Sequence, residues 1–169
     1  MSSTHKKVIV RKFSSEWLAG YVAATHFVIE GQLEVLDLAG KVITIPLDQV
    51  KWLCFVRDFN SGEVNNPERL LRKSFTGRPR TEGLWLRLCL KDNDHVEGIA
   101  INDISLLDAA GIFITPPDIR SNTQRIFVPR QSITKLEIVA LISSAGRRKT
   151  ATSAEPVASL QEDLFRDSN

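Results

Sequence analysis

Short runs of alternating apolar and polar residues recur along the chain and predict β-strands. Residues 7–13 (KVIVRKF) and 17–23 (WLAGYVA) flank a polar turn, which is the pattern of a β-hairpin. Three further runs, rich in Val, Ile, Leu and aromatic residues, follow at residues 33–38, 41–47 and 50–56. Gly and Pro between these runs indicate turns. The first third of the chain therefore predicts five short strands.

The second half of the chain repeats this pattern. The interval from Leu86 to Gly98 matches that from Val8 to Gly20, with apolar residues at equivalent positions. Further on, residues 45–56 align without a gap to residues 128–139. Two matching segments in the same order indicate two copies of one β unit. A single β-sandwich whose strands merely share the alternation is the alternative.

The repeat predicts a chain in four parts. Residues 7–59 and 82–142 are each expected to form a small five-stranded β-barrel, so that the fold class is mainly β. A basic connector, with a short helix around residues 66–75, joins them over residues 60–81. Residues 143–169 are rich in Ser, Ala, Thr and charge, have no apolar period, and are expected to be a disordered tail.

Composition and charge narrow the class of protein. The 169 residues carry a net charge of only +2, which argues against indiscriminate binding of nucleic acid by the whole surface. No apolar run approaches the ~20 residues needed to span a bilayer. We therefore expect a soluble cytoplasmic protein that does not associate with membranes. Cys54 and Cys89 lie in strand-like runs without metal-ligand spacing, so a zinc site is not expected.

The two units resemble Sm-like (SH3-like) small β-barrels. Residues 85–111 carry most of this likeness and residues 8–59 a fainter copy; with residues 111–133, the chain also resembles uncharacterised bacterial proteins that contain tandem domains of this kind. The resemblance covers residues 7–142 and implies a fold rather than an activity. In Sm-like proteins that bind RNA, an Asp/Asn loop and a basic-Gly pair form the pocket. Asn102 and Asp103 match the first element, but the last turn has Arg130 and no Gly.

Local basic charge is concentrated in the connector. Arg72, Arg78 and Arg80 lie close together in the sequence, near Phe75. Guanidinium groups match phosphate oxygens, and an aromatic ring can stack on a base. We therefore interpret this segment as a candidate site for phosphate groups of RNA or DNA. A solvated linker whose charges keep the two units soluble is the alternative.

A second basic cluster follows the Pro-Pro dipeptide at residues 116–117. It contains Arg120 and Arg125 in a polar loop, and loops on a rigid scaffold often carry binding groups. We include both arginines among the candidate phosphate-binding residues. A turn stabilised by Asn and Ser side chains explains the same sequence.

The order of a basic segment followed by Asp103-x-Ser105 is also similar to PilZ domains, which bind cyclic di-GMP. That resemblance implies a signalling module as an alternative function. Two features depart from the PilZ pattern: Asp108 stands where a Gly is expected, and the connector contains no Arg-x-x-x-Arg.

Catalytic chemistry has little support in the sequence. His5, His26 and His95 share no local motif with a nucleophile or an orienting carboxylate. Glycines are scattered singly, so no phosphate-cradling glycine loop is present. We expect no catalytic residue, no bound metal and no cofactor.

The tail ends in a short apolar motif. Gln161, Leu164 and Phe165 have the spacing Gln-x-x-Leu-Phe, which resembles the peptide by which bacterial replication and repair proteins bind the β sliding clamp. In such peptides the Gln binds at the rim of a pocket and the apolar pair fills its floor. Docking of the tail on its own barrel, or on an unrelated partner, remains open.

These observations predict a non-catalytic binding or adaptor protein. One hypothesis is a nucleic-acid or nucleotide binder that uses its basic loops. The other is an adaptor that recruits a protein partner through its tail. The sequence leaves the ligand and the oligomeric state open.

Overall fold

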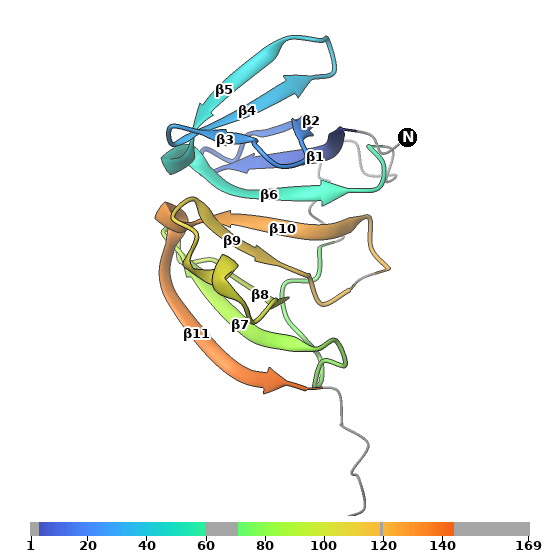
Figure 1. Ribbon diagram of the computed structural model, residues 1–169, viewed down its shortest axis with the longest axis vertical. Coiled ribbons are helices and arrows are strands. Elements are labelled where there is room, and N and C mark those ends of the chain that lie inside the picture. Colours follow the sequence, from blue (N-terminus) through green and yellow to red (C-terminus); the bar gives the residue numbers. More distant parts are fainter. Residues whose placement is uncertain (1–3, 60–70, 119, 144–169) are drawn as a thin grey trace, which may run out of the picture.

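The computed structural model describes residues 4–59, 71–118 and 120–143, and these residues form a mainly β structure (Figure 1). The predicted fold class is confirmed. The strands are β1 (His5–Lys12), β2 (Trp17–Ala23), β3 (Val28–Ile29), β4 (Gln32–Asp37), β5 (Val42–Pro46), β6 (Val50–Val56), β7 (Gly83–Leu90), β8 (His95–Ala100), β9 (Gly111–Ile114), β10 (Thr123–Pro129) and β11 (Ile133–Ile142). Short 3-10 helices are η1 (Leu47–Gln49), η3 (Ile104–Leu107) and η4 (Arg130–Ser132).

Two predictions fall partly or wholly on residues that the structure does not describe. The helix expected around residues 66–75 is one, and its described part, residues 71–75, is not helical. The tail at residues 143–169 is the other, because only Ser143 of it is described. No helix in the described ranges is long and apolar enough to cross a membrane.

The described strands form two sheets. One contains eight strands in the order β3-β4-β2-β1-β6-β10-β9, with β5 paired to β4, and the other has the order β11-β7-β8. The larger sheet runs through both halves of the molecule, because β6 of the first half pairs antiparallel with β10 of the second. The sheets do not close into two separate barrels. A pair of hydrogen bonds between Ile99 and Thr115 (2.9 and 2.8 Å) joins them.

Strands β1, β6 and β10 lie in the middle of the molecule, between two hydrophobic cores (Figure 1). Val8, Leu53 and Phe127 belong to the core of the first half. Trp52 and Ile126, on the opposite faces of β6 and β10, belong to the core of the second half. Burial on both faces explains why these strands read as continuous apolar runs rather than alternating ones.

The two halves have the same strand pairing. In each, the first strand pairs with the second and with the last, and a 3-10 turn precedes the last strand. Ser15 and Asn93 occupy equivalent hairpin turns, and both have positive φ (70° and 62°). The hydrogen bonds of the turns are also repeated in the two halves. Leu47 N donates to Gly31 O, and the equivalent Arg130 N donates to Ala110 O, both at 3.0 Å. The internal repeat is thus visible in the hydrogen bonds as well as in the sequence.

Glycines in equivalent positions allow neighbouring strands to approach closely. A Cβ at Gly20 would lie 2.5 Å from Leu36 O, and a Cβ at Gly98 would lie 2.8 Å from Thr115 O. No side chain fits at these distances. The Gly that marks the second strand of each repeat therefore has a packing reason in both halves.

Candidate functional site

The described part of the connector, from Leu71 onward, is held against the second half by Glu97 of β8. The backbone N–H of Glu97 donates to Lys73 O at 2.7 Å, and its carboxylate accepts from Phe75 N at 3.1 Å. Trp85 Nε1 and Arg87 Nε also donate to this carboxylate, at 3.2 and 2.8 Å. Glu97 is only 3% exposed, so its charge is used to position the connector.

Burial alone would raise the pKa of Glu97. Hydrogen bonds from Phe75 N, Arg87 and Trp85 act in the opposite direction and lower it below the ordinary value. The carboxylate is therefore ionised at neutral pH, and the three donors around it are satisfied. This arrangement is typical of a structural anchor rather than of a proton-transfer group.

An ion-pair cluster links the connector to both halves. Asp94, in the β7–β8 turn, accepts from Lys51 Nζ at 2.8 Å and from Lys73 Nζ at 2.6 Å. Both ammonium groups also lie over the ring of Trp52, 4.7 and 5.5 Å from its centroid. Burial opposes ionisation of Asp94, but hydrogen bonds from the two lysines hold its pKa well below its usual range. Lys73 of the connector therefore has a structural role.

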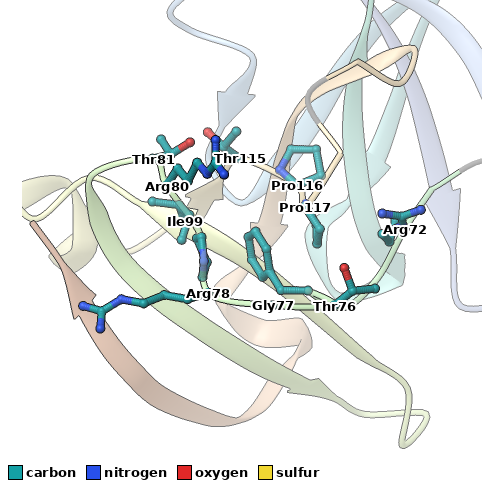
Figure 2. A pocket seen from close by; sticks show the side chains of 12 residues that line it. Arg72, Thr76, Gly77, Arg78, Arg80, Thr81, Ile99, Thr115, Pro116 and Pro117 are labelled. Carbon is teal, nitrogen blue, oxygen red and sulfur yellow. The ribbon is translucent and has the colours of Figure 1, made fainter. Parts of the chain in front are cut away.

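The connector arginines line a cleft instead. Its volume is about 310 Å³, and Thr115, the residue after β9, forms part of its wall together with the two prolines that follow. Figure 2 shows Arg80 extending toward Thr115 at one end of the cleft, Arg72 at the other end, and Arg78 pointing away from the other lining side chains. The polar and charged lining residues are Arg72, Thr76, Arg78, Arg80, Thr81 and Thr115. We call this cleft the arginine cleft.

No described residue forms an ion pair with Arg72, Arg78 or Arg80, in contrast to Lys73. All three arginines are exposed. Beside them, Pro116 is buried and Phe75 packs edge-on against Trp85 with 5.4 Å between ring centroids. The cleft therefore presents threonine hydroxyls and guanidinium groups that no carboxylate in the described ranges pairs, which suits an anionic ligand.

A second basic cleft lies next to the first, and Thr115 lines both. Its volume is about 390 Å³, and Lys6, Lys7 and Arg125 supply its positive charge. The guanidinium carbon of Arg125 lies 4.1 Å from the centroid of the Phe113 ring. Four of the five predicted arginines thus line these two adjoining clefts. Arg120 is exposed in the loop between β9 and β10 and lines neither of them.

Sequence reasoning missed Lys6 and Lys7. They lie far from the other basic residues in the sequence and reach the second cleft through the pairing of β1 with β6 and of β6 with β10. Their only signal was a pair of lysines at the start of an apolar strand, which a solvated strand end explains equally well.

The residues that resemble Sm-like and PilZ sites have structural contacts. Asp103 Oδ1 accepts from the backbone N–H of Ser105 at 2.9 Å and caps η3. Arg130 donates to Leu106 O at 2.7 Å and to Asp108 O at 2.9 Å. The side chain of Arg130 therefore fixes η3, and the capping of η3 accounts for the Asp-x-Ser pattern.

Two further findings concern metal ligands and the tail. Among the described residues, no group of three or more His, Cys, Asp or Glu side chains is arranged to hold a metal ion. The partner-binding candidates Gln161, Leu164 and Phe165 lie outside the described residues.

Comparison with known proteins gives a family without an assigned activity. No curated protein and no solved structure matches the chain. A family model described as a family of unknown function, DUF6982, matches residues 4–140, which include both halves of the repeat and both basic clefts. The chain therefore belongs to the DUF6982 family.

Proposed function

We propose that this protein is a non-catalytic binding protein whose arginine cleft takes the phosphate groups of single-stranded RNA or DNA. The carrying observation is that Arg72, Arg78 and Arg80 line one cleft without an ion-pair partner among the described residues. Nearby basic residues that serve the fold, such as Lys73 and Arg87, are paired with carboxylates. This difference in pairing supports the proposal that Arg72, Arg78 and Arg80 bind an anionic ligand.

The adjoining second cleft extends this basic surface. A nucleic-acid strand that crosses Thr115 passes from the connector arginines to Lys6 and Arg125, beside Lys7, whose Nζ lies 3.7 Å from Asp58 Oδ1. The Phe75 and Phe113 rings lie along this path and offer apolar surface for bases. Phosphate contacts of this kind give affinity without sequence preference.

The resemblance to Sm-like domains, some of which bind RNA, is consistent with this proposal. We place the protein in the cytoplasm, where single-stranded nucleic acid is accessible. The cyclic di-GMP reading shares the phosphate chemistry but has no separate observation in its favour. Competition by that nucleotide distinguishes it.

Replacing Arg72, Arg78 and Arg80 together by alanine is expected to abolish binding of a fluorescent single-stranded oligonucleotide at ~50 mM salt. At this salt concentration even non-specific phosphate contacts are strong. For the unmodified protein, the three phosphate contacts of the arginine cleft alone predict that log affinity falls with log salt with a slope of about −2, and contacts in the second cleft make this slope steeper. Fluorescence anisotropy over a salt series measures both quantities.

The matched control replaces Lys12, Lys41 and Lys91 by alanine, which removes the same charge from positions outside both clefts. It should retain most of the affinity. Equal losses in the two triple variants would reduce the effect to net charge, and an unmodified protein that binds no oligonucleotide at low salt would end the proposal. Displacement by cyclic di-GMP but not by oligonucleotide would favour the alternative.

We further propose that the tail recruits a protein partner, with the β sliding clamp as the candidate. The support is the spacing of Gln161, Leu164 and Phe165. Two apolar anchors on a short peptide suffice for a small interface. The full chain is expected to bind purified clamp with micromolar affinity by calorimetry and to lose binding after Gln161→Ala or Phe165→Ala. Glu162→Ala serves as the control, and undiminished binding by both test variants would contradict the proposal.

A further inference from the structure

The two halves of the molecule are joined by strand pairing between β6 and β10. Phe127 lies opposite Leu53, Ile126 opposite Cys54, and Arg125 opposite Phe55. Leu53 is fully buried, and Phe127, 3% exposed, extends the core of the first half. In this way β10 covers an edge that the first half would otherwise expose.

The repeat places a second copy of this edge on β11. Residues 50–56 of β6 are equivalent to residues 133–139 of β11, so Leu136 corresponds to Leu53 and Ile138 to Phe55. Within the described residues, β11 pairs with β7 alone. Leu136 and Ile138 are accordingly 42% and 60% exposed. The surface that β10 covers in the first half thus has no described strand over it in the second.

The repeat also places a second copy of the covering strand on β5. Strand β5 is equivalent to β10, since Pro46 corresponds to Pro129 and each strand leads through a 3-10 turn into the last strand of its half. In the described part of the chain, β5 pairs only with β4, and Val42 on it is 61% exposed. Figure 1 shows β5 and β11 at opposite ends of the long axis. One chain cannot pair them with each other.

We propose that β5 of one chain pairs antiparallel with β11 of a second copy, as β10 pairs with β6 within the chain. Transferring the internal register places Val42 opposite Ile138 and Thr44 opposite Leu136. The contact thus brings two exposed apolar side chains, Val42 and Ile138, into one cross-strand pair. The occupant is a second copy because the chain itself carries the strand that fits.

The remaining positions on the two edges are compatible with this pairing. Ile43 would lie opposite Glu137, whose carboxylate already has Arg87 Nη1 at 3.5 Å and Lys135 Nζ at 3.9 Å. The proline at the end of each covering strand does not interfere, because Pro129 lies beyond the register that pairs β10 with β6. Pro46 takes the same place in β5.

The proposed contact is heterologous, since each chain contributes two different edges. Repetition of such a contact gives a closed ring or an open fibre rather than a symmetric dimer. It also extends the basic clefts into a series of equivalent sites, although the assembly does not depend on the proposed nucleic-acid binding.

Sedimentation velocity on the full chain tests the proposal. The unmodified protein is expected to show, with rising concentration, species above the monomer mass of 18.9 kDa. Val42→Lys and Ile138→Lys should each remain monomeric, because each breaks one of the two edges. An equimolar mixture of the two variants should form a two-chain species and nothing larger. The intact β5 of the Ile138→Lys chain can pair with the intact β11 of the Val42→Lys chain, and the other two edges are blocked.

Ile29→Lys on β3, an exposed isoleucine on neither edge, is the matched control and should assemble like the unmodified protein. Circular dichroism checks that every variant is folded. As a second measurement, chains with Val42→Cys mixed with chains with Ile138→Cys should form an interchain disulfide on oxidation. A monomeric unmodified protein, loss of assembly with only one of the two lysine variants, or a mixture that stays monomeric would overturn the proposal.

Discussion

Replacing Trp52 by alanine is expected to lower the free energy of unfolding by about 4 kcal/mol, the range found for large aromatic residues removed from a core. Trp52 is 1% exposed and projects from β6 of the first half into the core of the second. Its loss leaves a cavity between the halves and removes the ring over which Lys51 and Lys73 lie. Urea denaturation followed by far-ultraviolet circular dichroism measures the change.

Trp17→Ala is the matched control, because Trp17 is 36% exposed at the start of β2. A loss of about 1 kcal/mol is expected there, in proportion to the smaller buried area. If the two variants lose similar stability, Trp52 does not fill a core shared by the two halves.

Glu97→Gln is expected to cost about 2 kcal/mol at neutral pH, because the variant keeps the shape but loses the charge that accepts hydrogen bonds from Phe75 N, Trp85 Nε1 and Arg87 Nε. The pKa of Glu97 is lowered in the folded protein. The ionised carboxylate therefore stabilises the fold at pH values above 4.5, the ordinary pKa of a Glu side chain. As the pH falls below that value the carboxylate loses this advantage. The difference in stability between the two proteins should therefore shrink toward acid pH.

Glu137→Gln is the matched control, because Glu137 is a second, more exposed carboxylate paired with Arg87. Glu137 Oε2 lies 3.5 Å from Arg87 Nη1, but its side chain is 42% exposed, so a change within about 0.5 kcal/mol is expected. Equilibrium denaturation at several pH values compares the variants. A pH-independent loss for Glu97→Gln would show that packing, rather than charge, accounts for the effect.

The repeat and the turn chemistry were predictable because both are local. Pro46 and Pro129 each precede a three-residue turn, and the structure gives both the same 3-10 conformation. The joining of the halves was not predictable in the same way, because the pairing of β6 with β10 is non-local and any edge strand has the same backbone groups. One sequence signal did exist. Residues 52–56 and 126–128 are continuously apolar, which indicates strands buried on both faces.

The candidate site was predictable where its residues are close in sequence. Arg72, Arg78 and Arg80 lie within one segment, and the structure places them at one cleft. Lys6 and Lys7 join the adjoining cleft only through the long-range strand order, which no local pattern contains. The role of Lys73 could not be predicted either. Its partner Asp94 lies in a hairpin turn, where a charged side chain is usually exposed to solvent.

The double-sided burial of β6 has a consequence for how the chain is made. When the ribosome has released the first half, the outer face of β6, with Trp52 and Cys54, is not yet covered by Ile126 of β10, which has still to be synthesised. At about 5–20 residues per second, that interval lasts several seconds. Throughout it the nascent chain presents an apolar strand to its neighbours on the polysome. An apolar strand that is exposed in this way favours aggregation of the nascent chain until the second half covers it.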